Sequence, residues 1–164
     1  MKNPNNKFPD SFREFLTELN QFNVEYLLIG GFAMGAYGHM RATNDLDIFI
    51  NATGENAQRM LKACKSYGIP AESLEEEMFL LPKMVVIGQP PIKIEILKKL
   101  DIIDFTYAYE RAKIVEVDNV LIKVVSLEDL ILLKQAAVKG RDKSRDSEDL
   151  SFLQKLKNSI RGNS

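Results

Sequence analysis

The chain has 164 residues, of which 45% are hydrophobic and 27% charged, and its formal net charge is −1 at pH 7. These values are typical of one soluble globular domain, and the near-zero net charge argues against a protein that coats nucleic acid nonspecifically. No apolar run reaches the roughly 18–20 residues of a membrane span, and the polar N-terminus lacks the apolar core of a signal peptide, so we expect a cytoplasmic protein without membrane association. The single cysteine, Cys64, excludes an internal disulfide and a multi-cysteine zinc site.

The predicted elements indicate one domain, residues 1–164, with an α+β (α/β) fold. Capping boxes open two of the helices, Ser11 with Glu14 and Ser126 with Asp129. In chain order we expect a helix at 11–20, a strand at 24–29, a short helix at 31–37, a strand at 46–50, a helix at 55–67, a short helix within 72–81, hairpins at 82–97 and 113–125, and helices at 126–140 and about 144–158. This order favours a mixed sheet flanked by helices, with a core at about 24–125 and C-terminal helices at about 126–158.

Two aspartates lie one residue apart inside an apolar segment, "TNDLDIFIN" at residues 43–51. Alternation along a strand directs Asp45 and Asp47 to the same side, about 6.5–7 Å apart along the backbone. Two carboxylates on one face repel each other unless a cation lies between them, and hard oxygen ligands suit Mg²⁺ or Mn²⁺. The segment therefore predicts a divalent-metal site.

A third carboxylate, Glu95, lies between two isoleucines in "PIKIEIL", another apolar strand segment. Paired metal ions organise phosphoryl displacement, and such a site usually has a further carboxylate from a neighbouring strand. We therefore expect Glu95 to join Asp45 and Asp47. The alternative is that these acids are solvated at sheet edges and pair with Lys93 or Arg41.

Five residues are candidates for phosphate binding. Gly30 and Gly31 stand between a predicted strand and a helix, where backbone N–H groups can approach a phosphate closely. Arg41 can reach a phosphate or balance the carboxylates, and Thr43, at the strand entry, has the same two explanations. Lys134, in an apolar helix, either extends to solvent or contacts a polyphosphate.

Two other features leave their roles open. His39, the only histidine, is a catalytic candidate, although a histidine at a helix end is more often a surface or structural residue. Arg141, Lys143 and Arg145 form a basic cluster that either contacts a substrate or makes exposed ion pairs.

The spacing of these motifs resembles the nucleotidyltransferase superfamily related to DNA polymerase beta. The pattern of that superfamily is h-G-[GS], nine to thirteen residues, D-h-[DE]-h and a later h-[DE]-h, and this chain has "LIGG", thirteen residues, "DLDI" and "IEI". The segments "GGFAMGAYGHMRATNDLDIFI" and "LEDLILLKQAAVKGRDKSRDSEDL" are similar to a small bacterial branch with minimal nucleotidyltransferases, abortive-infection toxin nucleotidyltransferases and lincosamide nucleotidyltransferases. The resemblance covers roughly residues 24–153 and implies the nucleotidyltransferase fold.

The resemblance also implies an enzyme that transfers a nucleoside monophosphate from a nucleoside triphosphate, such as ATP, to a hydroxyl acceptor and releases pyrophosphate. Asp45, Asp47 and Glu95 would hold two Mg²⁺ or Mn²⁺ ions, or Glu95 would take the proton of the acceptor. Gly30 and Gly31 would contact the triphosphate.

The acceptor and the activity stay open at this point. The acceptor is a small molecule such as an antibiotic, a tRNA end or a protein side chain. Many active members have serine next to the glycine pair, where this chain has Phe32. The alternative is a non-catalytic nucleotide-binding or regulatory module, for example one partner of a toxin–antitoxin pair. The sequence also allows a homodimer.

Overall fold

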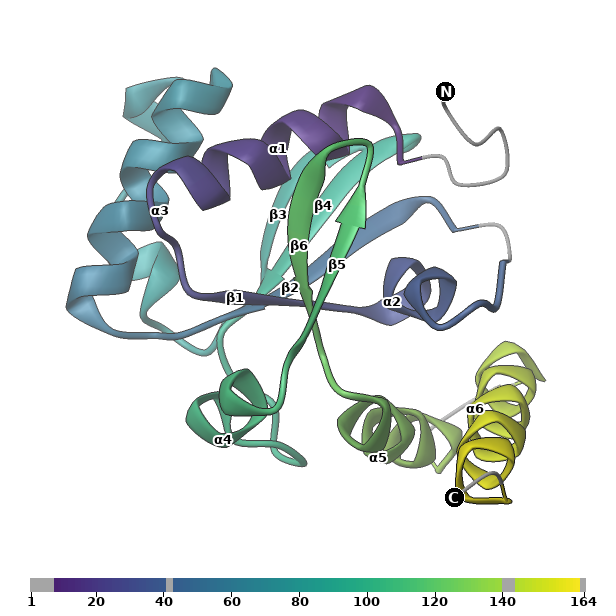
Figure 1. The fold of residues 1–164 in the computed structure, drawn as a ribbon. Coiled ribbons are helices and arrows are strands. Elements are labelled where there is room, and N and C mark those ends of the chain that lie inside the picture. Colours follow the sequence, from purple (N-terminus) through teal and green to yellow (C-terminus); the bar gives the residue numbers. More distant parts are fainter. Residues whose placement is uncertain (1–7, 41–42, 140–143, 163–164) are drawn as a thin grey trace.

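Six strands form one mixed sheet in the order β3-β4-β2-β1-β6-β5 (Figure 1). The computed structural model describes residues 8–40, 43–139 and 144–162. Strand β2 pairs in parallel with β4 and antiparallel with β1, so the two strands that carry the candidate carboxylates are neighbours. The strands are β1 (Tyr26–Ile29), β2 (Asp45–Ile50), β3 (Val85–Gln89), β4 (Ile92–Leu97), β5 (Lys113–Val117) and β6 (Val120–Val124). The predicted mixed sheet is confirmed.

Helices lie on both sides of this sheet. In Figure 1, α1 and α3 lie on one side, α4 and α5 lie on the other, and α6 packs against α5. The helices are α1 (Asp10–Gln21), α2 (Gly30–Ala36), α3 (Gly54–Tyr67), α4 (Phe105–Glu110), α5 (Leu127–Val138) and α6 (Ser144–Gly162), with 3-10 turns η1 (Ala71–Ser73) and η2 (Glu76–Phe79). Among the described residues, none of these helices is long and apolar enough to cross a membrane.

The central strand β2 divides its side chains between the two faces of the sheet. Leu46, Ile48 and Ile50 are fully buried on one face. Asp45, Asp47 and Phe49 point to the other face, because side chains alternate along a strand. The Phe49 ring packs edge-on against Phe105 of α4, with 5.2 Å between the ring centroids. The carboxylates therefore lie on the same face of the sheet as α4.

Two helix starts differ from the sequence prediction. Helix α1 begins at Asp10 after Pro9, and no side chain caps it, so the predicted capping box of Ser11 and Glu14 is wrong. The fixed φ of proline, here −51°, suits a helix start without a side-chain cap. Helix α4 was not predicted, since six residues are too few for a periodic pattern; its N-cap is Asp104.

The start of α5 follows the prediction in part. The hydroxyl of Ser126 accepts a hydrogen bond from the backbone N–H of Asp129 at 3.1 Å, as an N-cap should. The Asp129 carboxylate does not close the box, because it accepts two hydrogen bonds from Arg111 at 3.0 and 3.1 Å.

Candidate active site

Three carboxylates meet on one face of the sheet, as the sequence predicts. In the parallel ladder between β2 and β4, Asp47 is the register partner of Glu95, and Asp45 is the partner of Lys93. Paired residues of adjacent strands share a face, so all four side chains lie on the same side of the sheet. Asp47 and Glu95 also share a side-chain hydrogen bond. Because the ladder fixes both strands, these carboxylates are held close together by the backbone.

Asp47 and Glu95 shift each other's pKa in opposite directions. Burial, the hydrogen bond to Glu95 and the negative charges of Glu95 and Asp45 together raise the pKa of Asp47 to about 8. The hydrogen bond with Asp47 and the neighbouring Lys93 ammonium lower the pKa of Glu95. The two neighbouring carboxyl groups therefore resist ionising together, and additional positive charge would be needed before all three carboxyl groups of the cluster ionise.

Lys93 supplies part of that positive charge. Its Nζ lies 2.8 Å from Glu95 Oε1 and 3.8 Å from Asp45 Oδ2. Within the described residues, no group of three or more His, Cys, Asp or Glu side chains is arranged to hold a metal ion. Carboxylate oxygens are nevertheless the donors that hard divalent cations prefer, and the Lys93 ammonium already lies between two of them. In this structure the Lys93 ammonium holds the position between Glu95 and Asp45.

Gly30 allows the backbone to approach the carboxylates closely. It has a φ of +74°, and a Cβ atom at this position would lie only 2.3 Å from Asp47 Oδ2. Any other residue at this point would displace the carboxylate or the chain. The first glycine of the pair is therefore explained by both backbone conformation and space.

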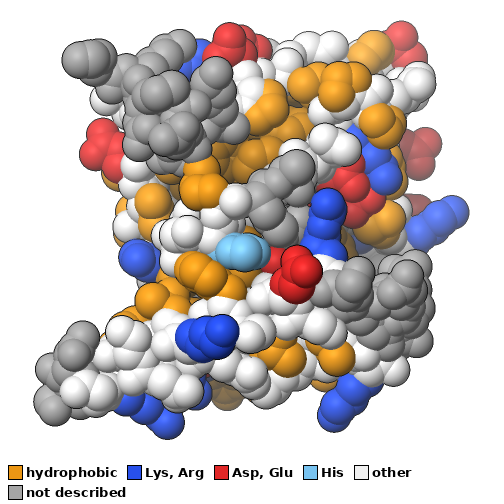
Figure 2. All heavy atoms as spheres, turned by 90° about the vertical axis from the view of Figure 1, so that its right-hand side faces the viewer, with side chains coloured by type: hydrophobic (Ala, Val, Ile, Leu, Met, Phe, Trp, Pro, Cys, Tyr) orange, Lys and Arg blue, Asp and Glu red, His pale blue; other side chains and the backbone are white. Residues whose placement is uncertain are grey.

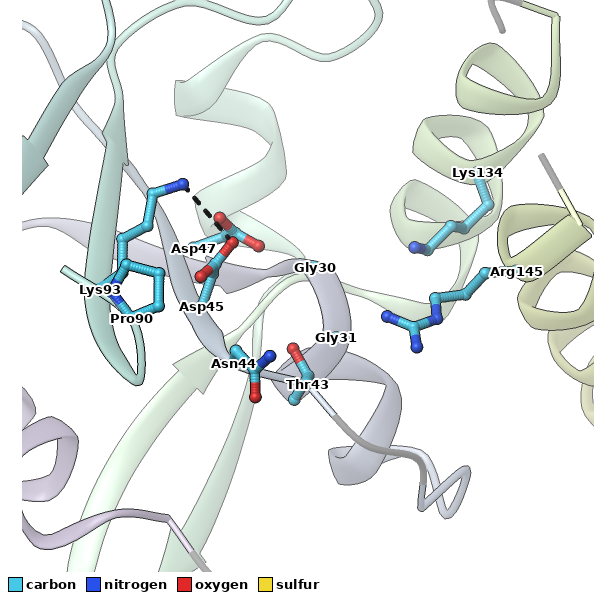
Figure 3. A pocket seen from close by; sticks show the side chains of 10 residues that line it. All are labelled: Gly30, Gly31, Thr43, Asn44, Asp45, Asp47, Pro90, Lys93, Lys134 and Arg145. Carbon is cyan, nitrogen blue, oxygen red and sulfur yellow. Dashed lines mark ion pairs between the residues drawn. The ribbon is translucent and has the colours of Figure 1, made fainter. Parts of the chain in front are cut away.

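A cavity of about 410 Å³ opens in front of these groups (Figure 3). Asp45, Asp47 and Lys93 form one side of it, and Lys134 of α5 and Arg145 of α6 extend toward it from the opposite side (Figure 3). The cavity is lined by Gly30, Gly31, Thr43, Asn44, Asp45, Asp47, Pro90, Lys93, Lys134 and Arg145. A cavity with carboxylates on one side and two cations on the other can bind a metal-associated polyphosphate.

Lys134 is held in place by acids of α6. Its Nζ lies 2.9 Å from Asp149 Oδ2 and 3.3 Å from Asp146 Oδ1. Asp149 is fully buried, and its other oxygen lies 3.4 Å from His39 Nε2. The His39 ring also packs against Phe152, with 4.6 Å between the centroids. Figure 2 shows acidic and basic side chains meeting around the histidine on this face.

The sequence-predicted residues divide into three groups. Asp45, Asp47, Gly30, Gly31, Thr43 and Lys134 line the cavity, and Glu95 is hydrogen-bonded to Asp47 beside it. His39 contacts α6 rather than the cavity, which gives it a structural position. Arg41, together with Arg141 and Lys143 of the basic cluster, lies outside the described residues.

Four cavity residues were missing from the predicted set or left open in it: Asn44, Pro90, Lys93 and Arg145. Lys93 could have been found, because it stands two residues before Glu95 and alternation places both on one face. Arg145 reaches the cavity only because α6 packs on α5, which no local pattern shows.

Phe32 does not enter the cavity. Its ring stacks on Phe8 at 4.7 Å and packs edge-on against Phe12 at 5.5 Å, both measured between centroids. The aromatic residue after the glycine pair is therefore a packing residue that leaves the cavity side of the pair open.

Solved structures of nucleotidyltransferases share this fold. The lincosamide antibiotic adenylyltransferase LnuA, solved with lincomycin, is 15% identical, with a TM-score of 0.57 over 93% of this chain and 99% of that chain. The antibiotic-resistance factor ANT(2'')-Ia is 11% identical, with a TM-score of 0.56 over 94% and 91%. TM1012 from Thermotoga maritima, described as a nucleotidyltransferase, is 19% identical, with a TM-score of 0.56 over 92% of each chain. At these identities the likeness shows the fold.

A sequence family gives the more specific assignment. Residues 14–163 match the model of the nucleotidyl transferase AbiEii toxins, which belong to type IV toxin–antitoxin systems. A search of curated proteins found no match. Because the match covers nearly the whole chain, this protein belongs to the AbiEii nucleotidyltransferase toxin family. The resemblance to abortive-infection nucleotidyltransferases and the predicted fold class are both confirmed.

Proposed function

We propose that this protein transfers a nucleoside monophosphate from a nucleoside triphosphate to a hydroxyl acceptor and releases pyrophosphate, and that it does so in the cytoplasm. The observation that carries the proposal is the arrangement of the 410 Å³ cavity, with a carboxylate cluster facing two cations across a glycine pair. The family supports nucleotidyl transfer in general. The metal, the nucleotide and the acceptor are the parts that we add.

The carboxylates are the proposed ligands of Mg²⁺ or Mn²⁺. Asp45 and Asp47 would bind two ions and Glu95 one of them, after Lys93 leaves its ion pairs. Divalent ions at such a site supply positive charge that orients a triphosphate and acidifies a hydroxyl group. A metal at this point also favours the ionised form of Asp47, whose pKa is otherwise raised by its neighbours.

The other residues would bind and orient the nucleotide. Gly30 and Gly31 leave room for the triphosphate beside Asp47, while Lys134 and Arg145 would contact its oxygens from the opposite side. Glu95 either remains a metal ligand or accepts the proton of the acceptor hydroxyl as a general base. Only the general-base role would require the acceptor hydroxyl to lie within hydrogen-bond reach of Glu95.

The acceptor is an antibiotic-like small molecule, a tRNA end or a protein side chain. The names of LnuA and ANT(2'')-Ia favour the first of these, and the toxin family favours a cellular target together with an antitoxin partner. We give the family more weight, because the match to it covers nearly the whole chain, whereas the antibiotic enzymes share only the fold.

A second candidate function is a nucleotide-binding or regulatory module without turnover. One observation favours it: Lys93 already neutralises Glu95 and Asp45, as a permanent replacement for a metal would. Calorimetric titration with Mn²⁺ and each of the four nucleotides separates the two candidates, because the enzyme must bind both and a module can bind nucleotide alone.

The direct test is the variant Asp47→Asn. We expect it to fold, because asparagine has nearly the same shape, and to lose at least about 100-fold in transfer of labelled nucleotide, because a central oxygen ligand loses its charge. The measurement is labelling of tRNA, cell protein, lincosamides and aminoglycosides with each α-labelled nucleotide.

The matched control is Asp118→Asn in the β5–β6 turn. Asp118 has a φ of +49°, a conformation that asparagine also accepts, and it lies outside the cavity. The control should label as wild type does. Labelling by Asp47→Asn at the wild-type rate would contradict the proposed mechanism.

A further inference from the structure

A second cavity, of about 390 Å³, lies at the C-terminal ends of β2 and β4. It shares no lining residue with the first cavity. It is lined by Phe49, Asn51, Ala52, Lys98, Lys99, Leu100, Asp101, Ile103, Asp104, Phe105 and Thr106. Its volume is within the range of small-molecule sites, about 300–1,000 Å³.

A buried lysine without a partner lines this cavity. Lys98 is only 6% exposed, and its Nζ is buried with no hydrogen-bond partner among the described residues. No ion pair joins it to Asp101 or Asp104, although both line the same cavity. The Asp104 side chain accepts a hydrogen bond from the backbone N–H of Tyr107 instead. Burial lowers the pKa of Lys98, as expected for an ammonium group removed from water.

Packing alone does not explain a lysine at this position. Leucine or methionine would fill the same space, whereas a buried ammonium group without a partner is unfavourable. A bound anion is one way in which such a group is satisfied. A second cation, Lys99, lines the same cavity and is exposed, and Thr106 adds a hydroxyl group.

We propose that this second cavity binds the phosphate or carboxylate group of an anionic small molecule, with the Lys98 ammonium as the principal contact and Lys99 as a supporting one. Because the Lys98 Nζ is sealed from solvent in this structure, the side chain must turn toward the cavity before an anion there completes its missing hydrogen bonds with charge-assisted ones. The proposal is independent of nucleotidyl transfer, because it uses different residues and a different cavity.

The experiment titrates the full chain with inorganic phosphate and, separately, with acetate, while backbone amide signals are followed by NMR. We expect saturable shifts at Asn51, Lys99 and Thr106 with at least one of the two anions, and the stronger response identifies the ligand chemistry. Lys98→Met should weaken this binding at least tenfold, and Lys99→Met less than that. The control Lys65→Met, on the exposed side of α3, should bind as wild type does.

Three results would overturn the proposal. These are the absence of saturable shifts with either anion, shifts confined to Thr43 and Asn44 of the first cavity, and equal affinity of wild type and Lys98→Met. The second result would assign the anion to the nucleotide site, and Lys134→Met would then abolish it.

Thermal unfolding gives a second measurement that does not depend on the amide signals. Without added anion, Lys98→Met should melt a few degrees above wild type, because the variant keeps the packing and loses the unpaired ammonium. Phosphate or acetate should raise the melting temperature of wild type and leave that of Lys98→Met unchanged. A variant that melts below wild type without anion would show that the ammonium has a partner within the protein, which contradicts the proposal.

Discussion

The two cavities differ in how their lysines are satisfied. In the first cavity, Lys93 is paired with Glu95 and Asp45, and Lys134 with Asp149 and Asp146. In the second, Lys98 has no partner among the described residues. A ligand of the first cavity must therefore compete with existing ion pairs, whereas an anion in the second cavity would give Lys98 the partner that it lacks. Affinity at the first site depends on how easily those internal pairs separate.

The largest expected effect comes from removing the buried partner of Lys134. Among the described residues, Asp149→Asn leaves the buried Lys134 ammonium paired with Asp146 alone and removes the charge that faces His39. We expect a loss of about 3–5 kcal/mol in the free energy of unfolding, measured by urea denaturation, since breaking a buried pair leaves an uncompensated charge.

Asp146→Asn is the matched control for that change. Asp146 is about one-third exposed, so its loss should cost under about 1 kcal/mol. Equal losses for the two variants would show that burial does not distinguish these acids, and the contrast between paired and unpaired lysines would lose its energetic basis.

A smaller effect is expected at Lys93. Lys93→Met removes the cation that competes with a metal ion, so we expect Mn²⁺ to bind about tenfold more tightly, which corresponds to about 1.4 kcal/mol. Isothermal titration calorimetry measures this directly. Lys93→Arg keeps the charge and should bind Mn²⁺ as weakly as wild type. Weaker binding by Lys93→Met than by wild type would mean that Lys93 assists the metal rather than replacing it.

A further expected effect is a pH dependence of the metal-free protein. Because the pKa of Asp47 is raised on folding, its contribution to stability is complete below its unfolded value and is lost as the pH rises toward about 8. The lowered pKa of Glu95 acts only in acid, where stability is lost as the pH falls. Urea midpoints should therefore decrease from about pH 5 to about pH 8 through Asp47.

Two variants test the origin of that slope. Asp47→Asn cannot titrate and should reduce it, while Asp118→Asn should leave it unchanged. Saturating Mn²⁺ should reverse the trend, since it binds the ionised carboxylates. A slope that persists in Asp47→Asn would assign the titration to another group.

The carboxylate cluster was predictable because its signals are local. Acids inside apolar strand segments identify Asp45, Asp47 and Glu95 one by one, and alternation gives the face of each. That β2 lies directly beside β4 in parallel is a tertiary fact, and the family pattern rather than the local sequence predicted that meeting.

The remaining features depend on contacts between distant segments. Arg145 reaches the cavity, and His39 contacts Asp149, only through the packing of α6. Phe32 replaces the serine of the family pattern next to the glycine pair, and only the structure shows that its ring packs against Phe8 and Phe12. Lys98 follows an apolar strand and resembles an ordinary exposed lysine in the sequence. The local sequence predicts neither its burial nor its lack of a partner.

The lack of a side chain at Gly30 limits which replacements this position can accept during evolution. Every amino-acid replacement there introduces an atom that collides with Asp47, so the position has no neutral alternative while Asp47 is in use. Once a copy no longer needs that carboxylate, the steric constraint is lifted and only the positive φ still disfavours other residues. We expect relatives that have lost catalytic activity to differ at position 30 before they differ at the three carboxylates.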